Sequence, residues 1–458
     1  MSVFIIIGVA KATPAKGISL SAGGMVELEN YFATEHGESF DEISKKNEAR
    51  LKLFLKAGSD NLFFYAVPDF YISSSYFSEN TGNDSSYRGN QTESGFSRTS
   101  SDDTEMKFNE LYLHYGFDNF QIRAGNQIIS WGTADVFNPT SYFNPADMRE
   151  TFAMDVDDVK TGVPALSGIV YFDNYTAEGV WVPVHVTADR AANDEFWALS
   201  PENYTFPVKF SADKRLESTP ENYGYGLRLT TTAGAMDLSA SYYHGPDNEP
   251  VYVPDRTEYN GDNPLAIYVS PEYYFVDKYG IDFARQYRKF VFQFEIVYCP
   301  DRRGVVKQDL FDSNAIVLPY TVDETESISY TAGFNYFIPV ADYFPWHDGE
   351  MIFTFEWFDV IYLNHTIMDP VMSEFAGLQL EDTFFDGRFS LKCSSLIDTK
   401  YNGMLVWPEA GYNFENGFSV EMSYMLFEGK RQMRNKEASV FNYLESNDIF
   451  IFKVKYEF

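Results

Sequence analysis

Hydrophobic and polar residues alternate with a period of two along much of the chain. In segment 223–229, tyrosine and leucine fall on one side, while Gly224, Gly226 and Arg228 fall on the other. The same alternation recurs in segments 236–243, 290–299, 328–338 and 418–426. Successive side chains of a β-strand point to opposite faces, so the pattern predicts strands with one large apolar face and one polar or small face.

The connections between these segments alternate in length. Asp118-Asn119 and Asn416-Gly417 are residue pairs that suit two-residue hairpin turns. Short turns on one side and long loops on the other are typical of outer-membrane barrels, whereas a soluble sandwich has no reason to arrange its loops in this way. The short turns lie near 58–61, 117–120, 233–235, 285–289 and 415–417, and the long links near 75–104, 133–164, 187–222, 246–272, 300–326 and 429–447.

The predicted fold is therefore all-β: a transmembrane antiparallel up-and-down β-barrel with short periplasmic turns and long external loops. We count roughly 17 candidate strands, but single-chain bacterial barrels have even numbers, so roughly 16 to 18 strands are expected. The short–long rhythm fails between Val340 and Asn402, and the miscounted strand is expected there.

Composition narrows the class of protein. The 458 residues include 35 Lys and Arg against 67 Asp and Glu, a formal charge of −32, together with 42 Phe and 33 Tyr. Disordered chains have few aromatic residues, and a strongly negative chain repels the nucleic-acid backbone, so both classes are disfavoured. The longest apolar run, residues 3–10, is too short for a spanning helix, which needs about 20 residues.

The N-terminal segment is similar to a short signal peptide. Residues 3–10 are apolar and are followed by Ala10-Lys11-Ala12, a small-x-small cleavage pattern, although a positively charged start is missing. We therefore expect a signal peptide in residues 1–12 and one barrel domain in residues 13–458; an ordinary first strand is the alternative. Cys299 and Cys393 fall on separate predicted strands, and two unpaired cysteines are favoured over a disulfide.

The last strand suits closure of a barrel, because a closed barrel must pair its last strand with its first. It resembles the C-terminal signal that the outer-membrane assembly machinery recognises. The alternative is the last strand of a soluble secreted β-protein. One face of this last strand is rich in aromatic residues and consists of Phe450, Phe452, Val454, Tyr456 and Phe458. Aromatics at other strand ends, namely Trp131, Trp181 and segment 343–346, are expected in interfacial girdles, with a buried core as the alternative.

Segment 121–147 resembles a strand and loop of porin-like barrels in the broad group that includes alginate-export channels. The likeness rests on its Gly-Asn-Gln and Trp131-Gly132 steps and on the Asn-Pro steps at Asn138 and Asn144. It implies a channel in the bacterial outer membrane, with no catalytic residue to carry over.

If the large apolar face meets lipid, the opposite face of each strand lines the lumen. Segregated charges on such a wall order polar solutes and set ion preference. Basic residues of the first and last strands become neighbours on closure and would form a strip that attracts anions; the alternative is that lumen charges pair and stiffen the wall. The predicted basic positions are Arg50, Lys52, Lys56, Arg123, Arg228, Arg388, Lys392, Lys453 and Lys455, and the acidic ones are Glu110, Asp237, Asp282, Glu295, Glu356 and Glu421, with Glu27, Glu29 and Glu457 on the same face.

The long link 133–164 is a candidate for a loop that folds into the lumen, and 187–222 for a second gating loop; ordinary external loops are the alternative. The candidate constriction residues are Asp135, Asn138, Pro139, Asn144, Pro145 and Asp147. Acids in links 75–104 and 246–272 would bind divalent cations that bridge to lipopolysaccharide, or form a solvated acidic surface.

Signals for enzyme chemistry are weak. The histidines are scattered without metal-ligand spacing, and we expect no catalysis, metal or cofactor. The histidines are His36, His114, His185, His244, His347 and His365. The sequence therefore predicts an outer-membrane channel or porin for passive diffusion or export of small polar solutes, anions among them. The alternative is a plugged structural or surface-binding barrel that acts as an adhesin or receptor.

Overall fold

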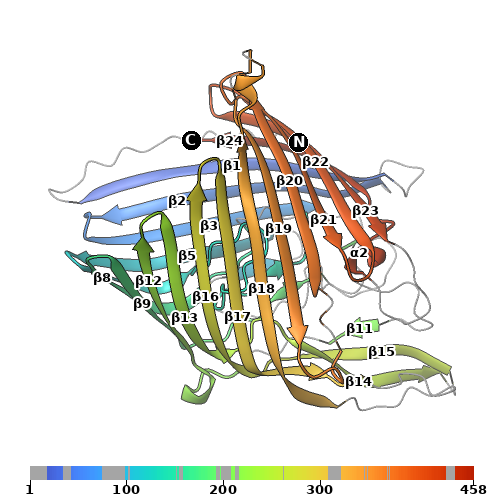
Figure 1. The fold of residues 1–458 in the computed structure, drawn as a ribbon. Coiled ribbons are helices and arrows are strands. Elements are labelled where there is room, and N and C mark those ends of the chain that lie inside the picture. Colours follow the sequence, from blue (N-terminus) through green and yellow to red (C-terminus); the bar gives the residue numbers. More distant parts are fainter. Residues whose placement is uncertain are drawn as a thin grey trace.

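The protein is a closed β-barrel, and its strands follow one another around the wall in the order of the chain (Figure 1). The computed structural model describes residues 18–34, 43–74, 98–101, 104–150, 152–153, 158–191, 196–197, 208–211, 216–260, 263–307, 321–344, 346–347, 349–368, 370, 372–429 and 439–458. The predicted signal peptide in 1–12, His36 and most of link 75–104 lie outside these residues.

Eighteen antiparallel strands form the barrel wall, each paired with its neighbours in the chain. They are β1 (Ser19–Ala33), β2 (Ser44–Gly58), β3 (Leu62–Ser74), β5 (Thr104–Phe117), β6 (Phe120–Gln127), β8 (Val163–Phe172), β9 (Tyr175–Val182), β12 (Gly224–Ala233), β13 (Met236–Pro246), β16 (Phe275–Tyr287), β17 (Phe290–Val305), β18 (Val322–Ile338), β19 (Met351–Tyr362), β20 (Glu374–Phe384), β21 (Phe389–Asp398), β22 (Gly403–Asn413), β23 (Phe418–Gly429) and β24 (Ile449–Glu457).

The remaining elements lie in the connections. They are β4 (Arg98–Ser101), β7 (Asp147–Met148), β10 (Asp189–Arg190), β11 (Val208–Phe210), β14 (Val251–Asn260), β15 (Asn263–Glu272), the 3₁₀ turns η3 (Pro220–Asn222) and η4 (Val340–Asp342), and the one-turn helix α2 (Val440–Tyr443). The hairpin β14–β15 projects beyond the wall in Figure 1. Within the described residues, no helix is long and apolar enough to cross a membrane.

The last strand closes the barrel onto the first. β24 pairs with β1 from Met25↔Glu457 to Ala33↔Ile449. Phe458 extends this ladder, because its N–H and C=O form two 3.0 Å hydrogen bonds with the backbone of Gly24. No open edge is left along this seam, as a wall in contact with hydrocarbon requires.

The period-two pattern becomes an inside and an outside. Large apolar side chains of the strands point outward and are exposed, for example Leu227 at 61% and Ile281 at 50%. Their neighbours Ser239, Ser241 and Thr331 point inward and are buried. The outer surface therefore presents hydrocarbon to its surroundings, and the inner surface is mostly polar.

A bulge at a proline changes which residues of β5 face inward. The register between β3 and β5 shifts between Val67 and Pro68, where proline has no N–H to give to the ladder. The shift inserts Asn109 as an extra residue. Odd-numbered Lys107 before it and even-numbered Tyr112 after it are therefore both turned inward and buried.

The predicted strand range is confirmed, and the irregular region is now explained. The β18–β19 turn, which carries η4, takes 12 residues at the short-turn end, from 339 to 350. The β21–β22 link takes only four residues at the opposite end, from 399 to 402. One long turn and one short loop invert the expected rhythm, which is why the strand count from the sequence was odd.

The long connections that enter the barrel form two apolar clusters against its inner wall. The Trp131 cluster comprises Ile129, Trp131, Tyr142, Phe143, Val163, Ala165, Val180, Val186, Tyr243, Val276, Val297 and Cys299. The Phe441 cluster comprises Tyr31, Ala153, Ala191, Trp197, Phe375, Leu405, Met425, Phe427, Val440, Phe441, Leu444, Ile449 and Ile451. Cys299 and Cys393 are both free, as expected.

Candidate functional site

The connection between β6 and β8, residues 128–162, folds into the barrel; we call it the inner loop. Its first aromatic residue, Trp131, is 1% exposed and packs edge-on against Tyr142 and Phe143 of the same loop. The indole Nε1 donates a hydrogen bond to Glu178 Oε2 on β9, at 2.9 Å. The position of Trp131 at a strand end predicted an interfacial girdle residue. This prediction is wrong: Trp131 anchors the loop against the inner wall.

Two buried carboxylates on the strands hold the middle of the inner loop. Glu295 on β17 accepts hydrogen bonds from the backbone N–H groups of Thr133, Ala134 and Thr140 and from Thr140 Oγ1, the last at 2.8 Å. Glu356 on β19 accepts from three consecutive N–H groups, those of residues 135–137. Both glutamates are 0% exposed. In the part of the chain that the structure describes, neither is paired with a basic side chain, so backbone dipoles compensate these charges.

Strand β18, between these two, adds side-chain contacts to the same stretch. Asn335 Nδ2 donates to Asp135 Oδ2 at 2.8 Å, and Thr331 Oγ1 donates to the carbonyl of Phe137 at 2.7 Å. The Phe137 ring stacks on Phe358 of β19 at 4.8 Å between centroids. The first third of the loop is thus fixed to β17–β19, on the side of the barrel away from its own root at β6 and β8.

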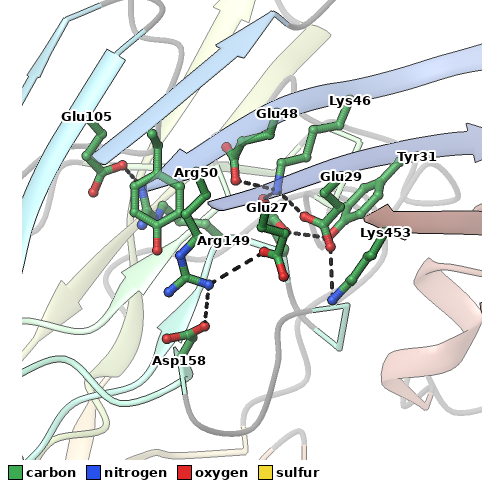
Figure 2. Close-up of polar contacts among 12 residues, drawn as sticks. Glu27, Glu29, Tyr31, Lys46, Glu48, Arg50, Glu105, Arg149, Asp158 and Lys453 are labelled. Atoms are coloured by element: carbon green, nitrogen blue, oxygen red, sulfur yellow. Dashed lines mark hydrogen bonds and ion pairs between the residues drawn. The ribbon is translucent and has the colours of Figure 1, made fainter. Parts of the chain in front are cut away.

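The last part of the loop is held by ion pairs on the opposite wall. Asp158 accepts from Arg50 Nη1 at 2.6 Å and from Lys52 Nζ at 2.7 Å, both on β2. Arg50 also forms two hydrogen bonds with Asp69 on β3, at 2.9 and 2.7 Å. Figure 2 shows Arg50 reaching toward Asp158 from the β2 ribbon.

A second group of ion pairs joins the loop to the closure seam, and Figure 2 shows its wall residues Lys46, Glu29 and Lys453. Glu150 of the loop accepts from Lys46 on β2 at 2.5 Å and from the Tyr31 hydroxyl on β1 at 2.7 Å. Lys46 also contacts Glu29 on β1 at 3.1 Å, and Glu29 pairs with Lys453 on β24 at 3.0 Å. The chain of charges therefore runs across β24, β1 and β2 into the loop.

Arg149 links the loop to β5. Its Nη1 lies 2.9 Å from Glu105 Oε2, and its Nε lies 2.8 Å from Asp147 Oδ1. Asp147 begins β7, which pairs with β10 of the next long connection. The inner loop and connection 183–223 are therefore fastened together, as well as to the wall.

The basic side chains around Asp158 and Glu150 favour the ionised form of these two loop acids. Burial opposes the charge on Asp158, but the hydrogen bonds and charges of Arg50 and Lys52 outweigh burial and hold the pKa of this carboxyl well below its usual range. Burial opposes the charge on Glu150 in the same way, and Lys46 and Tyr31 lower its pKa. Both carboxyls are therefore charged at neutral pH, and their ion pairs are intact.

Asn144 closes the base of the inner loop. Its Oδ1 accepts from the N–H of Ile129 at 2.7 Å, and its Nδ2 donates to the carbonyls of Gln127 and Thr161 at 3.0 and 2.8 Å. The carbonyl of the next residue, Pro145, accepts from the Thr161 N–H at 2.9 Å. The two Asn-Pro steps have different places: Asn138 and Pro139 lie at the β17–β19 contact, and Asn144 and Pro145 where the loop enters and leaves the wall.

The predicted lumen charges lie on inward faces of the strands, with one exception. Arg388 is in the β20–β21 turn, where its Nε donates to the carbonyl of Phe385 at 3.0 Å and its side chain is 43% exposed. The alternation continued past the end of the strand in the sequence, so Arg388 is corrected to a turn residue. Asp237 is on the inward face of β13 near the short turns, where Thr232 donates to it. Glu421, on β23, faces inward opposite Lys453.

Most of the predicted basic positions are paired with acids. Besides Arg50, Lys52 and Lys453, the paired positions are Arg228 with Asp282 at 3.0 Å, Lys392 with Glu409 at 2.7 Å and Lys455 with Glu457 at 2.9 Å. Among the described residues, Lys56 and Arg123 form no ion pair. Glu110 shares the inward face of β5 with Tyr112, next to these two.

The sequence missed the loop's own partners. Lys46, Arg149 and Glu150 were not singled out, because none belongs to a motif and two of them lie outside the alternating segments. Their signal was the occurrence of charged residues in a link already suspected of entering the lumen. The residues of the C-terminal assembly face, Phe450 to Phe458 in steps of two, lie on the outer side of β24 and its end, while Ile449 and Ile451 on the opposite face are buried inside.

In the described residues, no group of three His, Cys, Asp or Glu side chains is arranged to hold a metal ion. His347, for example, is buried against Asp382 at 2.8 Å, where it fixes the β18–β19 turn.

A closed barrel with an apolar outer band and a polar interior is the structure of an integral outer-membrane protein. Residues 64–360 match the family model described as "Protein of unknown function (DUF1302)", and the chain belongs to that family. No curated protein matches the sequence.

The chain is similar over most of its length to several solved porin structures. OccAB1 of Acinetobacter baumannii is 8% identical with a TM-score of 0.48, and covers 96% of this chain and 95% of its own. OmpF of Salmonella typhi, solved with daunomycin, is 9% identical with a TM-score of 0.43, covering 96% and 98%. OccD3 (OpdP) of Pseudomonas aeruginosa is 7% identical with a TM-score of 0.45, covering 97% and 93%. The assignment of the fold rests on the strand ladder of the protein itself.

Proposed function

We propose that this porin-like barrel lets small polar solutes, preferentially anions, diffuse passively across the outer membrane past the inner loop. The observation that carries the proposal is the attachment of one loop to opposite walls: residues 133–140 to β17–β19, and residues 149–158 to β1, β2 and β5. A loop attached in this way narrows the lumen, and the proposed pathway runs beside it. The proposal includes no catalysis and no cofactor.

The anion preference is supported by the unpaired cations. Many lumen acids on the strands are held in ion pairs, and Glu295 and Glu356 accept hydrogen bonds from backbone N–H groups. Lys56 and Arg123 form no ion pair; Glu110 and Glu178 interact with Arg123 only at longer range and offset part of its charge, so a positive field remains at the level of these two cations. The strong negative charge of the chain, −32, belongs largely to its other residues.

Conductance of the detergent-refolded protein in planar bilayers tests the proposal. We expect steady single-channel steps, with reversal potentials in a salt gradient that favour anions. Glu356→Ala should enlarge the steps, because it frees three loop N–H groups and loosens the constriction. Glu409→Ala is the matched control, since this wall carboxylate pairs with Lys392 and does not touch the loop. Equal conductance in all three proteins would contradict a pathway that passes the inner loop.

A plugged, surface-binding barrel is the second candidate, and the Phe441 cluster favours it. Three connections contribute apolar residues to this cluster inside the wall: Ala153 from the inner loop, Trp197 from connection 183–223, and Phe441 from α2. Such a cluster excludes water from its part of the lumen. A correctly folded barrel that never conducts would support this candidate and exclude the channel.

The partners in the membrane are part of the same proposal. The exposed aromatic face of β24, which ends at Phe458, suits recognition by the outer-membrane assembly machinery. Carboxylates of the external connections, such as Glu258 and Glu272 of the β14–β15 hairpin, suit divalent cations that bridge to lipopolysaccharide phosphates. Deletion of Phe458 should lower the amount of folded barrel in the outer membrane, measured by heat-modifiable migration on gels.

A further inference from the structure

The two uncompensated cations lie in a patch of aromatic rings on one section of the inner wall. Lys56 on β2 sits over the Phe63 ring of β3, with Nζ 4.0 Å from the centroid. Arg123 on β6 lies over the Tyr112 ring of β5 at 5.5 Å. The register places these residues in adjacent rows, since Lys56 pairs with Tyr65, Tyr65 with Tyr112, and His114 with Arg123.

The rings are in contact with one another as well as with the cations. Phe63 stacks on His114 at 4.4 Å with an interplanar angle of 16°, and Tyr65 lies 5.3 Å from Tyr112. The result is a cluster of aromatic rings across β3 and β5, with a positive group over one ring at each side. We call Lys56, Phe63, Tyr65, Tyr112, His114 and Arg123 the aromatic patch.

Polar atoms in the patch lack partners inside the protein. Nδ1 of His114, a residue that is only 8% exposed, is buried without a hydrogen bond, and so is Nε of Arg123. Buried polar groups are normally satisfied, so two unsatisfied nitrogens beside one another indicate a place where a ligand supplies the acceptor. Glu110 on the same face offsets one of the two positive charges, which leaves the patch positive.

A second cation–aromatic contact in the barrel shows what is different here. Lys392 on β21 lies 5.7 Å from the Trp407 ring, but its Nζ is also paired with Glu409 at 2.7 Å. That lysine is already neutralised by the wall. Lys56 and Arg123 have no carboxylate in ion-pair contact, so an anion can take the place that a carboxylate occupies beside Lys392.

We propose that the aromatic patch is a binding subsite for aromatic anions, that is, for a ring that bears one carboxylate or similar group. The guanidinium of Arg123 binds the anionic group, since the planar guanidinium matches a carboxylate in two-point geometry, and the ammonium group of Lys56 adds to the attraction from the other side of the patch. The ring of the solute packs on the aromatic surface of β3 and β5 in offset or edge-on contact. The subsite rests on the proposed channel and specifies its solutes. Aromatic anions bind more tightly than aliphatic ones. When the subsite is seldom occupied, they also pass through the channel more slowly than chloride.

Equilibrium binding to the detergent-solubilised barrel tests the subsite independently of conduction. The probes are benzoate, acetate and benzylammonium, titrated by calorimetry. We expect benzoate to bind. Acetate should bind with an affinity at least about tenfold lower, because it has no ring, and benzylammonium should not bind. Lys56→Gln with Arg123→Gln should weaken benzoate about tenfold or more, while Lys392→Gln should leave it unchanged. Phe63→Leu should reduce the preference for benzoate over acetate and keep the preference for anions.

The outcomes separate this subsite from the channel itself. Equal binding of benzoate and acetate, or an equal loss in Lys392→Gln, would overturn the subsite and leave only a general positive field. Heat-modifiable migration of each variant shows that it is folded, so that a loss of binding reflects the patch. A barrel that binds benzoate with the expected variant pattern but never conducts would refute the channel and retain the subsite.

Discussion

The inner loop is held by two opposite walls through different chemistry. On β17–β19, buried Glu295 and Glu356 accept hydrogen bonds mainly from backbone N–H groups of the loop. On β1, β2 and β5, side chains of the loop form ion pairs with side chains of the wall, as Asp158 does with Arg50. The first kind of contact depends on the path of the loop backbone, and the second on the identity of its residues. One wall therefore sets the shape of the constriction, while the other fixes its position and can be altered by single substitutions.

The largest effect is expected from removing both backbone-binding carboxylates. Glu295→Ala with Glu356→Ala leaves buried N–H groups without acceptors, each at a cost of about 1–3 kcal/mol. The loop should leave β17–β19. The temperature at which the gel band of the folded barrel is lost should fall by between several degrees and some tens of degrees. Gel migration after graded heating measures it. A variant as heat-stable as the wild type would show that this wall does not hold the loop.

Removal of Arg50 is expected to come next. Arg50→Met leaves Asp69 and Asp158 buried without their shared cation, and breaking such a pair costs about 3–5 kcal/mol. Neutralising both acids in the triple variant Arg50→Met, Asp69→Asn, Asp158→Asn should restore much of the loss. Graded heating again provides the measurement. If the triple variant is no better than Arg50→Met alone, the defect is in packing and not in uncompensated charge.

Acid should release the ion-pair wall through its two loop acids. Asp158 and Glu150 have lowered pKa values in the folded protein, so their stabilisation is complete above the unfolded carboxyl pKa of about 4 and is lost as the pH falls through the lower folded values. These ion pairs should therefore stay intact from about pH 8 to 5, and the current noise that their release causes should rise only below about pH 4. Asp158→Asn should show that noise already at neutral pH. A conductance change centred near pH 6 would point to another group.

The smallest effect is expected from Thr140→Val. This change removes one hydroxyl hydrogen bond to Glu295 and keeps the backbone N–H that donates to the same carboxylate. The cost should be about 1 kcal/mol, with unchanged conductance. Single-channel recording and graded heating check both parts. A loss comparable to that of the double glutamate variant would mean that the side chain, and not the backbone, carries this contact.

The sequence predicted the wall better than the loop. Alternation placed Glu295, Glu356 and Arg228 on inward faces, because a strand's period of two is a local property that each segment displays by itself. The same reasoning carried Arg388 one step too far, since it cannot tell where a strand yields to its turn. It also assigned Trp131 to a girdle, because an aromatic residue at a strand end has the same pattern whether the chain then turns outward or folds inside.

The loop's contacts could not be predicted for a physical reason. Glu295 binds backbone N–H groups more than 150 residues away in the chain, and every residue except proline has such a group, so no residue type reveals the pairing. The ion pairs of Asp158 and Glu150 do involve distinct residue types. Their partners Arg50 and Lys46 lie about a hundred residues earlier, and only closure of the barrel brings β2 opposite the end of the loop.

The four-residue link at 399–402 gives the outer mouth of the barrel a low lip. Across the mouth, β14 and β15 extend the rim by a full hairpin, so an object that approaches the cell surface meets a raised side and a lowered one (Figure 1). The rim is therefore uneven in height, and on its low side the Phe441 cluster, with Leu405 of β22, lies behind it. A bulky label attached at Thr399 should lie closer to the lipid surface than the same label at Tyr259 on the hairpin tip.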